Sequence, residues 1–533
     1  MMKKLLLLSI VALTTLGACQ KDFLDTKPTD QISESIVFTD LKNARAALNG
    51  IHRLLYSQGD QMDQNGEQSH MIIRDLLGED LCMSAAGNGW WNDTYKWNAH
   101  RNARATNTTY AWKFYYRVIF NVNGIIEGLN KNLKAQETDP NFKEIMGQAL
   151  TYRAWAYFNL VQLYAQRYDY PNVTNSQPGV VLRTTQTVTP QARATVEEVY
   201  AQINKDLDEA IILLADAKDP NQISDISLQA SQAIKARVAL TTGRWADAIS
   251  NATAAIKGHS LFSKKDLQQD SGYPSVFSSY PGEGSEWIWG TQQASDQPTY
   301  FFSYFAFMSW NFSSTNIRTN PKSITRELYE AMPATDARKS MFSLTGMDIK
   351  ARPEVNTSAL VCSYMSRKFR AAANSDSRGD IAYIRVAEMY LIKAEAEARS
   401  NKFADAQQTL FDLVSTRDNA YVKSTSTDDA LINEILLQRR IELWGEGFRF
   451  YDLKRLNSSL ERNIDKVVDP AAPVNPTEDE LKAYKKKHIY TDYAGHHSPT
   501  LCYTTSVNAG DVRWQWVIPQ DEINSNPEVK QNN

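Results

Sequence analysis

The sequence has few of the residues from which catalytic and metal centres are usually built. Its 533 residues include only four cysteines and seven histidines. No GxSxG nucleophile elbow, Walker A loop, GxGxxG fingerprint or HExxH pair occurs. The adjacent His496 and His497 have no identifiable third ligand, so we expect exposed loop histidines and predict neither a metal nor a cofactor. An EF-hand is excluded at 61–72, because Gln61 and Ile72 occupy end positions that require carboxylates.

Strong charge of either sign is also lacking. The formal net charge is -3, and the only basic run, Lys485-Lys486-Lys487, is short and typical of a solvated helix face. Because phosphate binding needs clustered Lys and Arg, no nucleic-acid partner is expected. The cysteines beyond residue 19 are too widely spaced for a zinc site, and their odd number allows at most one disulfide, so buried free thiols are expected. They are Cys82, Cys362 and Cys502.

Long apolar runs are confined to the N-terminus. Lys3-Lys4 precedes the apolar stretch from Leu5 to Leu13, which is too short to span a bilayer but suits a signal peptide. Small residues just before Cys19 match a bacterial lipobox, whose cysteine is diacylated on its thiol and then becomes the new N-terminus. We therefore expect a signal peptide over 1–18, a lipidated Cys19, and a membrane anchor without a membrane span.

Helical periodicity dominates most of the remaining chain. Trp245-Ala246-Asp247-Ala248 and Phe403-Ala404-Asp405-Ala406 repeat one pattern, an aromatic beside small residues after an Ala-rich helix. This is typical of tetratricopeptide-type helical hairpins, although the period is not sustained along the chain. Helices are predicted at 41–57, 110–132, 142–168, 195–216, 226–257, 381–400 and 428–446.

One interval interrupts the helical pattern. Residues 258–380 are rich in Gly, Ser, Pro and aromatics and predict an irregular subdomain with a few short strands. The resulting division of the chain is a signal peptide at 1–18, a lipidated tether at 19–37, an N-terminal helical region at 38–257 with a loop insertion at 82–108, the irregular subdomain at 258–380, and a C-terminal helical region at 381–533.

Five segments along the chain carry recognisable motifs. They are Asp22-Phe23-Leu24-Asp25; residues 148–167; Tyr383 to Ile392 with Ala394-Glu395-Ala396; Arg439 with Glu442-Leu443, Glu446-Gly447, Arg449 and Asp452-Leu453; and Val517-Ile518-Pro519 with Glu522-Ile523 and Asn526-Pro527. In this order the five segments resemble the SusD family, also called RagB/SusD. One departure is Gln438, where the family usually carries Glu.

The resemblance implies a mainly α fold, in which a SusD-like scaffold with tetratricopeptide-like helix pairs carries the irregular subdomain. It further implies a non-catalytic, cell-surface lipoprotein of the outer membrane. Such proteins bind oligosaccharide or polysaccharide and deliver it to a TonB-dependent, SusC-like transporter. The charged residues of its motifs are spaced to pair within and between helices, so we expect structural ion pairs rather than a catalytic pair. They are Arg385, Glu388, Arg439, Glu442 and Glu446.

Two polar loops carry aromatic residues suited to sugar binding, which needs flat rings for apolar C–H faces and polar side chains for hydroxyls. One runs from Gly87 to Asn98, and the other runs from Asp296 to Tyr304 and on to Trp310. The predicted glycan contacts are Trp90, Trp91, Asn92, Trp97, Tyr300, Tyr304 and Trp310.

A packing role for some of these rings remains open. Trp91 or Trp97 could plug the base of its loop, and Phe301, Phe302 and Phe307 could belong to the core. Trp287 and Trp289 alternate in a predicted strand, and Trp112 lies on a helix, so all three are expected in the core.

Three alternative functions also remain open. They are a peptide-capturing member of the same scaffold, a surface glycoside hydrolase with a carboxylate pair that no motif reveals, and a scaffold that binds only protein. The sequence does not identify the glycan, its linkage or the transporter-facing surface.

Overall fold

The computed structural model describes residues 38–171, 174–217, 222–297, 301 and 303–532, and the structural statements below concern these residues. The predicted signal peptide, Cys19 and the whole tether lie outside them, as do Tyr300 and Phe302.

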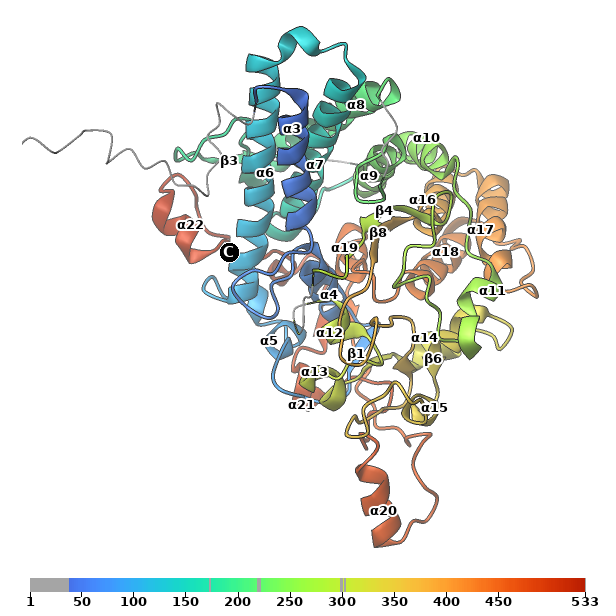
Figure 1. The fold of residues 1–533 in the computed structure, drawn as a ribbon. Helices are drawn as coiled ribbons and strands as arrows, with labels where there is room; N and C mark the ends of the chain where they lie inside the picture. The colour runs from blue at the N-terminus through green and yellow to red at the C-terminus, as the bar shows by residue number, and fades with distance from the viewer. Residues whose placement is uncertain (1–37, 172–173, 218–221, 298–300, 302, 533) are drawn as a thin grey trace, which may run out of the picture.

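Helices are the main regular structure and the strands are few and short, which confirms the predicted mainly α class. Helices α3, α6, α7 and α8 lie together in one half, and the remaining long helices form a second group beside them (Figure 1). The long helices are α3 (Leu41–Leu54), α6 (Thr106–Asn132), α7 (Pro140–Tyr164), α8 (Val196–Ala215), α9 (Leu228–Thr241), α10 (Trp245–Ile256), α16 (Val386–Arg399), α17 (Phe403–Arg417) and α18 (Asp428–Glu442).

Short helices lie mainly in the irregular subdomain and the C-terminal segments. They are α4 (Glu67–Leu76), α5 (Asn92–Tyr95), α11 (Lys264–Leu267), α12 (Phe305–Met308), α13 (Thr315–Thr319), α14 (Arg326–Glu330), α15 (Met347–Lys350), α19 (Arg449–Arg455), α20 (Glu478–Lys485), α21 (Pro499–Cys502) and α22 (Gln520–Ser525). The 3-10 helices are η2 (Ala99–Arg101), η3 (Lys134–Gln136), η4 (Gln269–Ser271), η6 (Ala337–Met341) and η7 (Val512–Trp514).

Polar caps explain where several helices begin. Asp40 accepts the backbone N–H of Asn43 at 2.8 Å and starts α3, as predicted. The α8 terminus is a capping box in which the Thr195 hydroxyl and the Glu198 carboxylate satisfy each other's backbone N–H groups.

The repeated aromatic–Ala pattern forms helical hairpins, as predicted. Helix α9 packs on α10, α10 on α16, and α16 on α17. Ala248 and Ala406 occupy equivalent positions and are fully buried, so their helices approach closely. Gly243 makes the turn between α9 and α10 at φ 70°, a conformation that favours glycine.

Strands are short, and one predicted helix begins too early. Residues Ile381–Arg385 form β8, which pairs antiparallel with β4 (Trp287–Thr291), and only from Val386 onward is the chain helical. This corrects the helix predicted at 381–400, because Tyr383 and Ile384 are extended by pairing with β4. Trp287 and Trp289 are buried there and Trp112 is buried on α6, as predicted.

The remaining strands form one four-stranded sheet and two small pairs. The sheet has the order β1 (Leu81–Met83), β5 (Lys322–Ile324), β7 (Met365–Ser366) and β6 (Phe342–Ser343). The pairs are β2 (Pro178–Val181) with β3 (Arg193–Thr195), and β9 (Leu460–Glu461) with β10 (Ser506–Val507).

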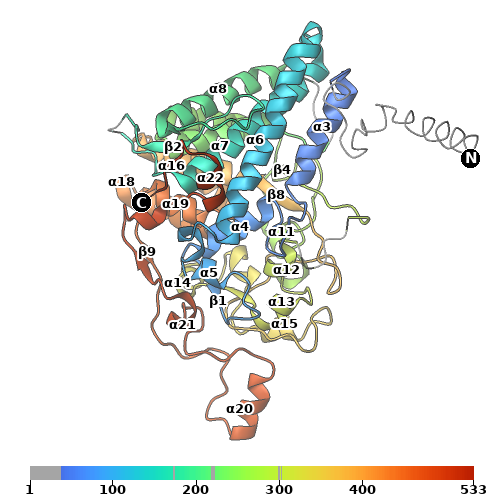
Figure 2. The ribbon, with the colours of Figure 1, turned by 90° about the vertical axis from the view of Figure 1, so that its left-hand side faces the viewer.

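Helix α20 projects from the opposite end to the long helices, in two perpendicular views (Figures 1 and 2). None of its residues is buried. Elsewhere Cys82, Cys362 and Cys502 are buried free thiols, as predicted. Within the described ranges, no helix is long and apolar enough to cross a bilayer.

Candidate functional site

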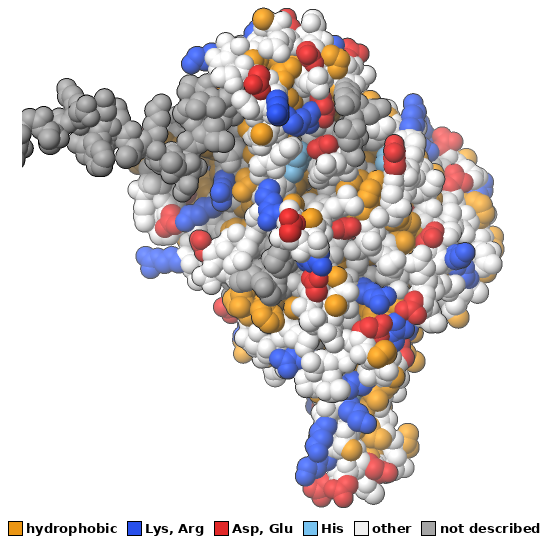
Figure 3. Space-filling model, viewed as in Figure 1, with side chains coloured by type: hydrophobic (Ala, Val, Ile, Leu, Met, Phe, Trp, Pro, Cys, Tyr) orange, Lys and Arg blue, Asp and Glu red, His pale blue; other side chains and the backbone are white. Residues whose placement is uncertain are grey.

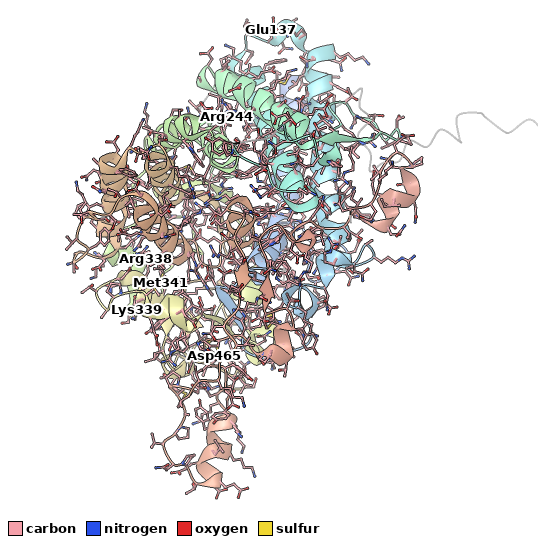
Figure 4. The ribbon with its side chains drawn as sticks, turned by 180° about the vertical axis from the view of Figure 1, so that it is seen from behind. Glu137, Arg244, Arg338, Lys339, Met341 and Asp465 are labelled. Carbon is pink, nitrogen blue, oxygen red and sulfur yellow. The ribbon has the colours of Figure 1, made fainter. Side chains whose placement is uncertain are left out.

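The charged residues of the C-terminal motifs form a buried network. The guanidinium group of Arg385 lies 2.6 Å from Glu446 and 3.1 Å from Glu442 and also pairs with Glu286, while Arg417 bridges Glu286 and Glu442 at 2.8 and 3.0 Å. Arg338 reaches the same network from η6 in the irregular subdomain (Figure 4). Two further pairs hold neighbouring helices together, Arg237 with Glu388 at 2.6 Å and Arg439 with Asp452 at 2.8 Å.

These contacts confirm the prediction that the charged motif residues form structural ion pairs. Burial alone would raise the pKa of Glu442, but Arg417, Arg385 and Arg338 outweigh it and hold that pKa well below its usual range. A carboxylate held ionised in this way cannot serve as a general acid.

The paired histidines are not exposed loop residues, which corrects the prediction. His496 and His497 are both buried. His497 lies 2.7 Å from the carbonyl oxygen of Glu79 and also contacts the Tyr95 hydroxyl, and burial lowers its pKa to about 3. Over the residues that the structure describes, no group of three His, Cys, Asp or Glu side chains is placed to hold a metal ion.

Two rings of the first aromatic segment face inward. Trp91 is 3% exposed and packs edge-on against Phe307, with 5.2 Å between ring centroids. Trp97 is also buried, donates its indole N–H to the carbonyl oxygen of Leu77 at 3.0 Å, and stacks edge-on against Trp514. The expected exposure of both rings is therefore wrong, because each fills the base of the loop.

The second segment also folds back into the core. Tyr304 and Trp310 are each 1% exposed. The Tyr304 hydroxyl donates to the carbonyl oxygen of Gly445, and Trp310 packs against Tyr273 with 4.8 Å between centroids. The expected exposure of these rings is wrong as well, because α12 and the chain after it turn inward.

Each segment nevertheless leaves one ring at the surface. Trp90 is half-buried among exposed polar neighbours, in a turn of residues 84–92 that we call the Trp90 loop. Phe301 is 43% exposed, so it is not the core residue that the packing alternative suggests. The two segments meet beneath the surface through Trp91 and Phe307.

Polar side chains accompany Trp90. Asn88 is exposed, and Asn92 is half-buried and donates to the carbonyl oxygen of Ala86 at 3.2 Å. Of the predicted glycan contacts within the described residues, only Trp90 and Asn92 therefore remain partly accessible.

A polar hollow of about 800 Å³ adjoins the start of the second segment. The Tyr56 hydroxyl donates to the Gln297 side chain at 3.4 Å, and both residues line the hollow. On the face shown in Figure 3, basic and acidic side chains are interspersed among uncharged atoms. The hollow is lined by Arg45, Asn49, His52, Arg53, Tyr56, Asn141, Glu144, Gln222, Ser224, Asp225, Gln292, Gln293, Ala294, Gln297 and Asp380.

The lining combines amides with carboxylates. Asn49, Gln222 and Gln292 are exposed. Asp380 accepts the backbone N–H groups of Tyr280 and Gln293 at 2.9 and 3.0 Å, while burial raises its pKa. Amides and carboxylates arranged in this way suit the paired hydroxyls of a sugar.

The sequence reasoning missed this hollow. Its residues come from α3 and the residues just after it, the start of α7, the 222–225 turn, the segment after β4 and the residue before β8. Each is an ordinary surface amide or charge, and only folding brings them together.

Comparisons with known proteins agree with this fold. A family model described as SusD-like, "starch-binding associating with outer membrane", matches residues 22–240, and the SusD family model matches residues 291–533. The chain belongs to the SusD family. No curated protein matches it significantly.

Solved structures share the architecture at low sequence identity. A SusD-like carbohydrate binding protein from Bacteroides vulgatus has a TM-score of 0.74 and 23% identity, with 92% of this chain and 97% of that one covered. A SusD superfamily protein from Bacteroides thetaiotaomicron has a TM-score of 0.71 and 23% identity over 92% and 99% of the two chains. One from Bacteroides fragilis has 0.66 and 20% over 93% and 100%.

Proposed function

We propose that this protein is a non-catalytic, cell-surface lipoprotein that binds oligosaccharide or polysaccharide and delivers it to a TonB-dependent, SusC-like outer-membrane transporter. Family membership along most of the chain supports this role, and the B. vulgatus relative is described as carbohydrate binding. Acylated Cys19 would hold the protein on the membrane.

The observation that carries the proposal is a polar hollow that adjoins the second aromatic segment, together with one partly exposed ring in each of the two segments. An apolar sugar face would stack on Trp90 or Phe301, whereas hydroxyl groups would bond to the amides and carboxylates of the hollow. Open surfaces of this kind gain little free energy per sugar, so affinities between millimolar and micromolar are expected, about -4 to -8 kcal/mol.

A binding role also accounts for the charged motif residues. The carboxylates of Glu286, Glu442 and Glu446 are buried in ion pairs, so their presence in the motifs needs no catalytic explanation. If the purified protein released products from a polysaccharide that it binds, a glycoside hydrolase would replace this proposal.

The test is titration of the purified protein against a broad glycan panel, with protein digests as the competing ligand class. Trp90→Ala should weaken glycan binding about tenfold, because a stacking ring contributes on the order of 1–2 kcal/mol. Tyr490→Ala is the matched control, since Tyr490 is 44% exposed on the segment that carries α20 and belongs to neither aromatic segment. Binding of digests with no response on the panel would favour the peptide-capturing alternative.

A further inference from the structure

The Trp90 loop rests on the chain that leads into β5. The Ser84 hydroxyl donates to the carbonyl oxygen of Pro321 at 2.7 Å, and the backbone N–H of Ala85 approaches the side-chain oxygen of Asn320 at 3.5 Å. Gly87 lies so close to Asn320 that a Cβ atom there would come within 2.9 Å of the Asn320 Cβ. The loop therefore takes its shape from residues 319–321.

One buried ammonium group, that of Lys322, bonds to the residues that support the Trp90 loop. Lys322 is 3% exposed in β5, opposite Met83 of β1. Its Nζ donates to the carbonyl oxygen of Asn320 at 2.6 Å and to the side-chain oxygen of Asn316 at 3.1 Å. Asn316 in turn donates its amide to the Asn88 side chain at 3.4 Å, so a continuous set of contacts joins Lys322 to the loop.

Burying the ammonium group of Lys322 lowers the stability of the fold. Within the described part of the chain its ammonium has no carboxylate partner, and burial lowers its pKa to about 7. Lys368 is equally buried, but it pairs with Glu446 at 2.6 Å. A methionine at position 322 would fill similar volume without a desolvated charge. The cost of Lys322 therefore needs a reason other than packing.

We propose that Lys322 is the positioning residue of the Trp90 loop. Its ammonium group fixes Asn316 and Asn320, and these hold the loop in the shape that presents Trp90 to ligand. The link to ligand rests on the proposed function, whereas the ordering of the loop does not.

The experiment compares Lys322→Met with Lys454→Met by hydrogen exchange and by glycan titration. Lys454 is the matched control: it is 5% exposed, donates to the carbonyl oxygens of Gln162 and Ala165 at 2.5 and 2.7 Å, and burial lowers its pKa to about 7 as well. Lys322→Met should speed exchange of residues 84–92 about tenfold and weaken glycan binding about fivefold. Lys454→Met should change neither.

The outcomes separate this inference from the proposed function. Unchanged exchange over residues 84–92 in Lys322→Met overturns the inference, whatever happens to affinity. Faster exchange in that variant, combined with full binding by Trp90→Ala, supports the positioning role and refutes the glycan site at Trp90. Faster exchange with unweakened binding, where Trp90→Ala does lose binding, overturns the functional link.

A second variant covers the case in which Lys322→Met does not fold. Asn316→Ala removes the amide that joins Lys322 to Asn88 and leaves the lysine in place. The same acceleration of exchange over residues 84–92 is expected, and wild-type exchange in this variant overturns the inference.

Discussion

Buried charges behave differently in the two regions described above. At the C-terminal motifs, Arg385, Arg417 and Arg338 share the carboxylates of Glu286 and Glu442, and each charge has an opposite neighbour. Beneath the Trp90 loop, the acceptors that the described residues offer to Lys322 are neutral oxygen atoms. The compensated charges join helices and strands of the scaffold, whereas the uncompensated ammonium group of Lys322 bonds to residues that support a loop.

The scaffold and the proposed ligand-binding hollow also differ in how far their polar groups are paired. The hollow keeps exposed amides at Asn49, Gln222 and Gln292, free to bond to a ligand or to water. Substitutions in the scaffold should therefore act on stability, and substitutions at the ligand face should act on binding.

The largest effect should come from removing a shared carboxylate. Glu442→Ala leaves Arg385, Arg417 and Arg338 with excess buried positive charge, so the free energy of unfolding should fall by about 4 kcal/mol. Urea unfolding followed by circular dichroism measures this change. Glu478→Ala on exposed α20 is the control and should change stability by less than about 0.5 kcal/mol. Equal effects of the two substitutions would contradict the structural role of the network.

The next effect depends on pH. Burial lowers the pKa of Lys322 from 10.5 to about 7, so the unfolded chain binds the proton more tightly than the folded chain does. The free-energy cost of burying the Lys322 ammonium group is fully present below pH 7. It decreases as the pH rises towards 10.5, because the folded protein then loses the proton. Between pH 6.5 and 10, the free energy of unfolding of the wild-type protein should therefore rise by on the order of 3 kcal/mol relative to that of Lys322→Met.

Paired urea unfolding curves at several pH values measure that gain. Lys486→Met, a substitution at an exposed lysine, should show no such trend relative to wild type. A stability difference between wild type and Lys322→Met that does not change with pH would show that Lys322 keeps an ordinary pKa.

The fold could largely be predicted from the sequence, because its signals are local. Apolar spacing, caps such as Asp40 and the repeated aromatic–Ala pattern predict helices that the structure contains. The prediction failed at residues 381–385, where pairing with β4 sets the backbone. Strand partners that are distant in the chain leave no local signal.

The candidate site was less predictable for the same reason. The local sequence around a tryptophan in a polar loop does not show whether its ring stays partly exposed, as with Trp90, or fills the base of the loop, as with Trp91 and Trp97. Only the fold decides between these arrangements. The hollow joins residues from α3 to Asp380, so its amides carry no pattern along the chain.

A smaller effect is expected at Phe301. Phe301→Ala should weaken glycan binding about fivefold, since the ring is only partly available for stacking. Its stability should match wild type, because a ring that is 43% exposed contributes little to the core. Isothermal titration measures the affinity and thermal unfolding checks the fold. Loss of stability without loss of affinity would assign Phe301 to the scaffold.

The smallest effect should be that of a single amide in the hollow. Gln292 is exposed and on this proposal would bond to ligand in competition with water, so Gln292→Ala should weaken glycan binding about threefold. Gln408, which lies on α17 and bonds to Asp412, provides a control amide outside the hollow.

Titration of Gln292→Ala in the Trp90→Ala background tests whether one glycan contacts both the hollow and the Trp90 loop. If it does, the two losses of binding free energy should add, because the side chains touch different parts of the ligand. If Gln292→Ala leaves affinity unchanged in both backgrounds, the glycan lies on the Trp90 loop alone and the hollow serves another purpose.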